Sequence, residues 1–532
     1  MEVLDARDEE RSIAWEHLLP IMVCLAYLVI AVYVGHDYVI GSYKTATDFY
    51  GMYAPDAKRI ANGEFPRSTF NGPGYPLVLS AITALTGDHF FSGKLISSFS
   101  AALSGLVAYY LFRALFGFRV AVFALPIILV VREYALFSVE PGTDLIFLVV
   151  CLTTILTIIC AKLGVWQRAI LAGILAGFAY LTRYNGVFLP ATIVTGIVIF
   201  NCFQLPFLKR LQVTAVHIVS FLVITSPWLW LNYVHHGSPL YNTNYLNMAT
   251  EFYGYDVFGD GAEQAAMVFK SFGDVVLHDP KGFVLHYLVN IVRRISKSLS
   301  GGFILPPIGL MAVAAIPVVL IRLRQREIWV FLFSLLLYML LMSFTHWEDR
   351  YYFYVMVCYI GLASYLLITT ADWISGKGWL SRRITHVGVL CVGTTAFYIS
   401  AMTSIKYIDQ HLKNQPYELL DAGEYLKSVS SNGIRIIARK PHLSFIVNGV
   451  EVSFPQVKTI DELHESLKES KADYLVYDRI ALVRRPELKM LAEPEKTIPW
   501  LKPVYSDLQR SLVIYRIEIE NTAQAGSLPP TQ

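Results

Sequence analysis

Residues 143–161, TDLIFLVVCLTTILTIICA, contain a single charged side chain, Asp144, near their start. An apolar run of this length matches the roughly 20 residues that a helix needs to cross a bilayer. Ten further runs of this character lie along the chain, at 17–40, 91–112, 120–131, 169–182, 186–206, 211–232, 302–321, 327–344, 353–371 and 384–403. The sequence therefore predicts a mainly α-helical membrane protein with about 11 (11–13) transmembrane helices.

The composition of the 532-residue chain agrees with this class. Hydrophobic residues make up 55% and charged residues only 16%, whereas soluble proteins average about 25% charged residues. The net charge of +3 provides no basic field, which excludes nucleic acid as a partner. Six cysteines form no CxxC pair, and the histidines at 235, 236 and 278 lack a third ligand at helical spacing. Neither a disulfide framework nor a metal site is expected.

Basic residues set the predicted orientation. They gather in five alternate short loops, around residues 113–119, 162–168, 209–210, 322–326 and 377–383. The positive-inside rule assigns these loops to the cytoplasm, which outweighs the basic residues of the first outer loop. The N-terminus is then cytoplasmic and the C-terminus periplasmic or extracellular.

The runs and loops define the expected domains. An acidic cytoplasmic leader (1–16) precedes a transmembrane domain (17–403) with two long outer loops, 41–74 and 233–300. The first loop is expected to contain short interfacial helices, and residues 75–86 to form a short interfacial or re-entrant helix.

A small outer α/β domain (404–520) and a flexible tail (521–532) follow the last span. The patterns within this domain predict strands at 434–438, 451–454, 474–477 and 512–517 and amphipathic helices at 417–429 and 460–470.

Ionisable groups from distant parts of the sequence fall on the outer face. Asp48 lies in the first outer loop, and Asp144 opens a predicted span. Arg183 follows another span, and Arg350 precedes a third. Charged groups at membrane depth are costly and mark functional sites. Because the cytoplasmic loops show no such mixture of carboxylates and guanidinium groups, we expect an outward-facing polar cavity.

Each of these residues also has a purely structural interpretation. Asp48 could cap a short helix, and Asp144 could satisfy the dipole of the helix that it opens. Arg183 and Arg350 could extend toward headgroups from helix ends. Function is favoured for Asp48, because a carboxylate near the lipid boundary gains the basicity of a catalytic base. The charged string 346–352 favours an anion site at Arg350, whereas both interpretations stay open for Asp144 and Arg183.

Several short motifs occur in the order found in the GT-C glycosyltransferases. TDFY at 47–50, AKRIANGEFP at 57–66 and GPGYPL at 72–77 resemble the first outer loop of that superfamily. GTDL at 142–145, LTRYNG at 181–186 and EDRY at 348–351 are further matches. The resemblance covers about the first 370 residues. Within the superfamily, it is strongest to the protein O-mannosyltransferase and lipid A aminoarabinose transferase group.

The resemblance implies a GT-C-type bundle and an inverting transferase that moves a sugar from a polyprenyl phosphate to an acceptor hydroxyl. By position, Asp48 matches the family's catalytic aspartate, Asp144 a second acidic position, and Arg350 a basic position near the donor phosphate. Many bacterial members carry a similar outer domain, which implies the bacterial inner membrane. Two departures stand out: Phe49 follows Asp48 where the protein mannosyltransferases have Glu, and no lysine precedes Pro73 as in the aminoarabinose enzymes. The sugar therefore stays open, as does the choice among a lipid, a glycan and a protein acceptor.

The expected chemistry needs few groups. A lipid phosphate leaves readily, so the reaction requires a base for the acceptor hydroxyl and cations for the phosphate. We assign the catalytic role to Asp48 and Asp144. Binding of the donor phosphate is assigned to Arg350, Arg183 and Lys58. Substrate contacts are expected from Glu140, Tyr75, Glu348 and Tyr351.

No cofactor is required, although paired carboxylates beside a phosphate can recruit a divalent cation. The expected partners are the lipid-linked donor, the acceptor and membrane lipids. The main alternative is a transporter or flippase for a lipid-linked or anionic substrate, and a second is a sensor subunit. Helix interiors that carry almost no charge argue against transport.

Overall fold

The computed structural model describes residues 2–160, 162–256, 260–430 and 433–519. The chain folds as two compact units. The first, called here the membrane unit, comprises Met1–Tyr38 and Asp56–Lys413. The second, the C-terminal unit, comprises Val39–Pro55 and Asn414–Gln532.

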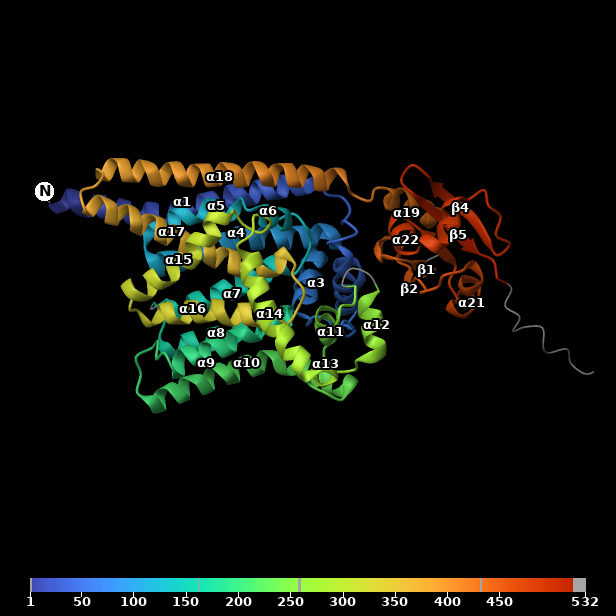
Figure 1. Ribbon diagram of the computed structural model, residues 1–532, viewed down its shortest axis with the longest axis horizontal. Coiled ribbons are helices and arrows are strands. Elements are labelled where there is room, and N and C mark those ends of the chain that lie inside the picture. Colours follow the sequence, from blue (N-terminus) through green and yellow to red (C-terminus); the bar gives the residue numbers. More distant parts are fainter. Residues whose placement is uncertain (1, 161, 257–259, 431–432, 520–532) are drawn as a thin grey trace, which may run out of the picture. The chain divides into compact units, whose positions relative to one another are not determined.

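All eleven predicted spans lie on helices of the membrane unit (Figure 1). Within the described chain, six helices are long and apolar enough to cross a bilayer. They are α1 (Glu2–His36), α4 (His89–Phe116), α8 (Val165–Thr182), α10 (Phe207–His236), α17 (Phe353–Gly376) and α18 (Arg382–Lys413). The other five are shorter: α5 (Phe118–Leu129), α7 (Asp144–Ile159), α9 (Phe188–Val198), α15 (Pro306–Arg322) and α16 (Arg326–Met342). The helical bundle is confirmed, and the number of crossings stays a prediction.

Burial distinguishes the helices of the bundle. In α17, residues 353–363 are almost completely buried, which places this helix in the core. By contrast, α1 and α18 expose large apolar side chains, among them Leu25 and Val29 on α1 and Leu390 on α18. Exposed apolar surface of this kind suits contact with lipid, because hydrocarbon solvates it without cost.

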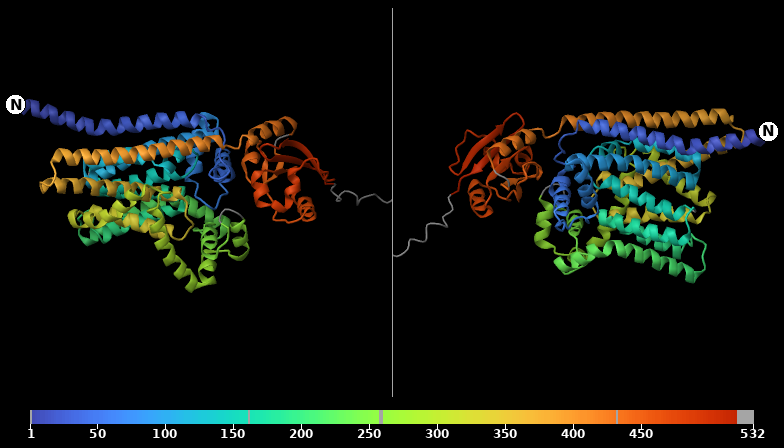
Figure 2. Two further views of the ribbon diagram at one scale, coloured as in Figure 1. Left: turned by 45° about the horizontal axis from the view of Figure 1, so that its top comes forward. Right: turned by 180° about the vertical axis from the view of Figure 1, so that it is seen from behind.

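Short helices gather at one end of the bundle, which we call the polar end. Figures 1 and 2 show α3 and α11–α13 there. These four helices are α3 (Gly74–Thr86), α11 (Tyr245–Tyr253), α12 (Gly261–Val268) and α13 (Phe272–His278). The membrane unit also contains α2 (Ala54–Ala61), α6 (Arg132–Phe137) and α14 (Pro280–Ser298). The expected helix at 75–86 is present as α3. The predicted long loop at 233–300 is largely helical, because α10 runs on to His236 and apolar side chains such as Phe252, Phe269 and Phe283 form a small core.

The C-terminal unit contains a five-stranded mixed sheet with strand order β2-β1-β3-β5-β4. Strands β1 (Arg435–Ala438), β2 (Val450–Ser453) and β3 (Tyr474–Tyr477) are parallel, and β5 (Leu512–Ile517) and β4 (Leu501–Asp507) are antiparallel to their neighbours. Ile436 pairs with Tyr474 across β1 and β3, and Leu475 with Tyr515 across β3 and β5. All four predicted strands are found, while β4 was not expected.

Helices complete this α/β unit. The predicted helices are present as α19 (Glu418–Val429) and α21 (Ile460–Ser470). Three short elements were not predicted: α20 (His442–Ile446), α22 (Arg479–Arg484) and η4 (Pro486–Ala492). Buried Leu463, Leu467 and Leu488 pack against the sheet, where Leu475 and Val513 are also buried.

The units divide the chain differently from the expected domains. The helix α18 continues to Lys413, ten residues beyond the predicted end of the transmembrane domain at 403. The segment Val39–Pro55, expected to belong to the transmembrane domain, folds with the C-terminal unit and includes the one-turn helix η1 (Phe49–Tyr53). Residues 2–16 form the start of α1, and the predicted tail at 521–532 lies outside the described residues.

Candidate active site

Two glycines of the GPG motif fix the chain around Arg183. A Cβ atom on Gly72 would lie 2.3 Å from the carbonyl oxygen of Leu181, and one on Gly74 would lie 2.8 Å from the backbone nitrogen of Thr182. Such distances leave no space for a side chain at either position. The loop before α3 therefore packs directly on the last residues of α8. Arg183 follows at once with extended backbone angles, which end that helix.

Arg183 forms an ion pair with Asp144. The Nη1 atom of Arg183 donates to Oδ1 of Asp144 at 2.5 Å and to Oγ1 of Thr143 at 3.0 Å. Asp144 lies in the first turn of α7 and is buried, so it meets the helix dipole and a guanidinium together. The side chain of Arg183 is only 14% exposed. Its guanidinium group is therefore held by Asp144, which does not fit the alternative of an arginine extending toward headgroups.

Arg350 joins the same cluster from the short helix η3 (Asp349–Tyr352). Its Nε atom donates to Glu348 at 2.6 Å, and its Nη1 atom lies 4.0 Å from Oδ2 of Asp144. His346 lies 3.5 Å from the other oxygen of Glu348. Burial raises the pKa of Glu348, but the hydrogen bond from His346 and the charge of Arg350 outweigh it and lower that pKa to about 2. Glu348 is thus a carboxylate throughout the physiological range.

The segment that carries Arg350 is held on both sides. Arg294 on α14 donates to the carbonyl oxygen of Thr345 at 2.7 Å and to Glu251 at 2.6 Å. The Trp347 ring stacks on Tyr352 with centroids 3.8 Å apart. These contacts fix the loop before η3. A loop that is already ordered loses little conformational freedom when a ligand binds.

Four charged side chains, from Asp144, Arg183, Glu348 and Arg350, therefore meet at the polar end; we call them the charged cluster. Tyr351 belongs with them, because both guanidinium groups lie over its ring, at 4.8 and 5.2 Å. The cavity between these groups measures only about 10 Å³. The two arginines and two carboxylates balance in charge. An incoming phosphate would therefore compete with Asp144 and Glu348 for the guanidinium groups.

Three other predicted site residues contact groups outside the charged cluster. Glu140 is completely buried and accepts a hydrogen bond from Tyr38 at 2.9 Å, with His411 at 3.3 Å. Tyr75 on α3 is also completely buried. The substrate contacts of Glu140 and Tyr75 stay a prediction. Lys58 on α2 lies close enough to His89 to act on it electrostatically.

Asp48 lies in the C-terminal unit, just before η1. Its side chain is half-buried and makes no capping hydrogen bond to that helix, so the capping alternative does not account for it. Its electrostatic neighbour is Lys440: burial and nearby Arg439 lower the pKa of Lys440, whereas Asp48 raises it.

Aromatic packing holds the Asp48 segment to α20. The ring of Tyr50 lies 4.5 Å from that of His442 and 5.3 Å from that of Phe445. Burial lowers the pKa of His442 to about 3, so this ring is neutral. Its Nε2 atom lies 3.2 Å from the carbonyl oxygen of Ser42 and must carry the proton, since a carbonyl only accepts. We call Tyr50, His442 and Phe445 the aromatic cradle.

Sequence reasoning missed several groups around these residues. Lys94 on α4 donates to the carbonyl oxygens of Gly35 and Tyr38 at 2.7 and 2.6 Å. A lysine inside an apolar run was a usable signal for a buried polar contact. Thr143 lies in the matched motif GTDL and His346 in the charged string 346–352, but neither residue was assigned a role from the sequence. Tyr338, which donates to the carbonyl oxygen of Tyr351 at 2.5 Å, gave no signal in a largely apolar helix.

Known proteins share this architecture. The family model of dolichyl-phosphate-mannose-protein mannosyltransferases matches residues 71–231. The structure of ArnT from Cupriavidus metallidurans bound to undecaprenyl phosphate superposes with a TM-score of 0.58, over 93% of this chain and 97% of that one, at 15% identity. The chain has the GT-C fold. The resemblance read from the sequence motifs is thus confirmed in the fold.

A second GT-C structure supports this assignment. The archaeal oligosaccharyltransferase AglB from Archaeoglobus fulgidus, in complex with an inhibitory peptide and a dolichol-phosphate, matches with a TM-score of 0.56 and 13% identity. That match covers 87% of this chain and 71% of AglB. No curated protein sequence matches the chain.

Proposed function

We propose that the protein is an inverting glycosyltransferase that moves a sugar from a polyprenyl phosphate to an acceptor hydroxyl on the outer side of the membrane. The observation that carries this proposal is the charged cluster at one end of a GT-C bundle. Two guanidinium groups that share the carboxylate of Asp144 form a site that a phosphate would enter by displacing carboxylate partners. The lipid phosphates bound in the ArnT and AglB structures support the choice of donor.

The proposed reaction is a single displacement. Asp48 takes the proton of the acceptor hydroxyl, and the hydroxyl oxygen forms a bond to the anomeric carbon from the side opposite the phosphate. The bond between that carbon and the phosphate oxygen breaks, and polyprenyl phosphate leaves with the electron pair. Arg350 and Arg183 hold the charge that develops on the phosphate, with Lys58 as a further cation of the donor site. Asp144 orients Arg183 in this scheme, and Tyr351 supports both guanidinium groups.

Donor binding tests the proposal first. Purified full-length protein is given a panel of polyprenyl-phosphate sugars, and thermal stabilisation is compared among the wild type, Asp48→Asn, Arg350→Ala and Arg324→Ala. Stabilisation is expected in all but Arg350→Ala. Arg324 serves as a matched control, because it is exposed in the loop between α15 and α16. Stabilisation that persists in Arg350→Ala would contradict the phosphate site.

Transfer by the same variants tests the base. Removing a general base costs roughly 10²- to 10⁴-fold in rate. We therefore expect Asp48→Asn to bind the donor but to transfer its sugar at least a hundredfold more slowly. Full transfer activity in Asp48→Asn would overturn the assignment. Absence of donor binding by every panel member would favour the transporter alternative.

A further inference from the structure

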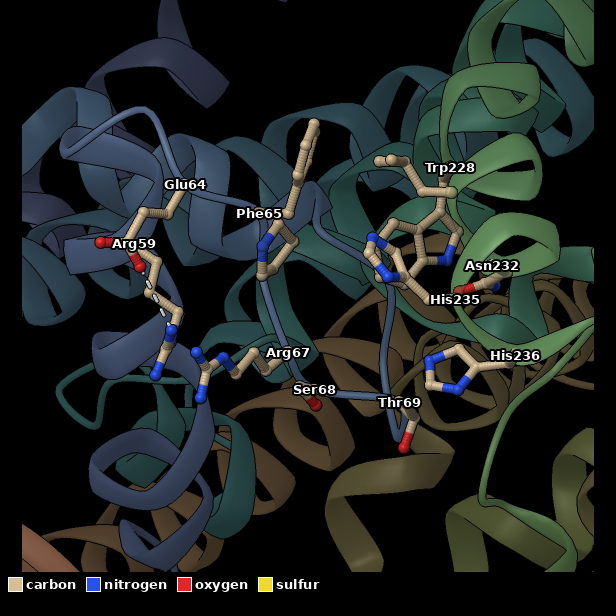
Figure 3. Close-up of a pocket in the computed structure, with 12 residues that line it drawn as sticks. Arg59, Glu64, Phe65, Arg67, Ser68, Thr69, Trp228, Asn232, His235 and His236 are labelled. Atoms are coloured by element: carbon tan, nitrogen blue, oxygen red, sulfur yellow. Dashed lines mark hydrogen bonds and ion pairs between the residues drawn. The ribbon is translucent and has the colours of Figure 1, made fainter.

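A second cavity lies at the polar end, outside the charged cluster. It measures about 600 Å³ and opens between the extended segment 64–69 and the last turns of α10 (Figure 3). Arg59, Arg67, Phe65, Trp228, Asn232 and His235 are among the residues that line it. Cavities of 300–1,000 Å³ with apolar walls and a few placed polar groups are typical ligand sites.

The wall formed by segment 64–69 is held in place by buried contacts. Asp56, which is 3% exposed, accepts hydrogen bonds from the backbone nitrogens of Arg67 and Ser68 at 2.8 and 3.0 Å. Thr243 donates its backbone N–H to the carbonyl oxygen of Thr69 at 3.1 Å. Backbone atoms of Arg67, Ser68 and Thr69 thus hold the segment in place. The side chain of Arg67 takes no part in these contacts and stays available for a ligand.

Two arginines line the cavity. Figure 3 shows Arg59 and Arg67 among the residues that line it, and both act electrostatically on the buried Asp56. Arg59 is paired with Glu64 at 3.3 Å and with the buried Asp56 at 4.0 Å, whereas across the described ranges the guanidinium of Arg67 has no ion pair. An anion in the cavity would give the guanidinium group of Arg67 an ion-pair partner.

The opposite wall is aromatic and equally fixed. The indole nitrogen of Trp228 donates to the hydroxyl of Tyr184 at 3.0 Å. Asn232, one helical turn later, donates to the carbonyl oxygens of Pro239 and Tyr241 at 3.4 and 3.3 Å. Phe65 faces His235 with ring centroids 6.5 Å apart. Flat aromatic surfaces beside amide and hydroxyl groups suit a sugar ring, which has C–H faces and a polar rim.

The cavity and the charged cluster are linked through one short segment of the chain. Tyr184, which holds Trp228, directly follows Arg183 in the sequence, so one short segment contributes to both sites. We infer that this cavity binds the acceptor, and that the acceptor is a sugar or glycan bearing a phosphate or carboxylate group. This inference rests on the proposed function, because it gives the donor phosphate to the charged cluster and the second sugar to the cavity.

Binding of small sugar anions tests the inference. Full-length protein is titrated with glucose 6-phosphate, glucuronate, glucose and inorganic phosphate, and thermal stabilisation is followed. We expect both sugar anions to bind at least about tenfold more tightly than glucose or phosphate alone, since the charge and the ring each contribute. A preference between the two anions would identify the acidic group.

Variants assign the binding to this cavity. Arg67→Ala is expected to weaken binding of the sugar anions about tenfold and to leave donor binding unchanged. Phe65→Ala, at an exposed position, should weaken the sugar anions but not inorganic phosphate. Arg324→Ala should match the wild type. Because the contacts that fix segment 64–69 use backbone atoms, Arg67→Ala is expected to fold normally.

Several results would overturn the inference. Equal binding of inorganic phosphate and glucose 6-phosphate would indicate a simple anion site. Loss of donor binding in Arg67→Ala would assign the cavity to the lipid phosphate instead. If no polyprenyl-phosphate sugar binds while sugar anions bind through Arg67, the transferase proposal fails and the sugar-anion site stands.

Discussion

The charged cluster and the aromatic cradle are held by opposite kinds of interaction. Asp144, Arg183 and Arg350 are fixed by buried ion pairs, with nitrogen–oxygen distances down to 2.5 Å. In the cradle, Tyr50 and a neutral His442 are fixed by ring packing. A group that must bind an anion needs partners that an anion can replace, whereas a chain segment that must only be positioned can rely on shape. The comparison predicts that charge changes damage the first region and volume changes the second.

Removing Asp144 should have the largest effect. Asp144→Ala leaves the buried guanidinium of Arg183 without its main partner, a change that costs about 3–5 kcal/mol. Thermal unfolding of the detergent-solubilised protein measures this loss. Asp372→Ala is the control, because Asp372 pairs with Arg119 at an exposed site where such pairs contribute less than about 1 kcal/mol. Equal losses of stability in Asp144→Ala and Asp372→Ala would contradict the claim that buried ion pairs hold the charged cluster.

Truncation of Tyr50 tests the cradle. Tyr50→Ala removes a buried ring and should destabilise the C-terminal unit by about 3 kcal/mol. Tyr50→Phe keeps the ring and loses only the hydroxyl that accepts the Gly41 N–H, at a cost of about 1 kcal/mol. Hydrogen exchange of residues 39–55 measures both effects. Impaired donor binding in Tyr50→Phe would show that the two regions are not separable.

A methyl group in the GPG motif should act on the cluster indirectly. Gly72→Ala places its Cβ against the Leu181 carbonyl, and forced packing of this kind costs about 1–3 kcal/mol. We expect weaker donor binding, because Leu181 leads into Arg183. The control is Gly388→Ala on α18, where a Cβ would meet no atom within 4 Å. Unchanged donor binding in Gly72→Ala would show that the loop before α3 does not contribute to the donor site.

The pH dependence of Glu348 gives the smallest expected effect. Its pKa in the folded protein is about 2, below the usual value of 4.5. A lowered pKa stabilises the folded state above pH 4.5, and this contribution is lost as the pH falls from about 4.5 to 2. Glu348→Gln should flatten the stability profile in that window by about 1–2 kcal/mol, allowing for partial exposure. Glu424→Gln, at an exposed position, is the control, and an equal change there would contradict the assignment.

The bundle was predictable because each transmembrane run is a local signal. The sequence could not show that α10 reaches His236 or that 245–298 is helical, since those helices are short and their core forms only after folding. The strand β4 escaped prediction because Lys502 and Pro503 interrupt its pattern, and an edge strand tolerates both.

For the site, the sequence placed Asp144, Arg183 and Arg350 on one face, and the fold brings them together. It could not tell which charged groups turn inward. Glu140 and Glu348 look alike in the sequence, yet the first is buried against Tyr38 and the second pairs with Arg350. Burial depends on contacts between distant segments, which a single sequence does not reveal.

The union of residues 39–55 with the C-terminal unit also has a consequence for biosynthesis. Ser42 and its partner His442 are separated by 400 residues. At synthesis rates of about 5–20 residues per second, roughly 20 to 80 seconds pass between the emergence of the two. Throughout that time the segment with Asp48 has no cradle, so its folding must wait until residues 442–445 have been made. The chain thus acquires its proposed base only after the whole bundle has been made.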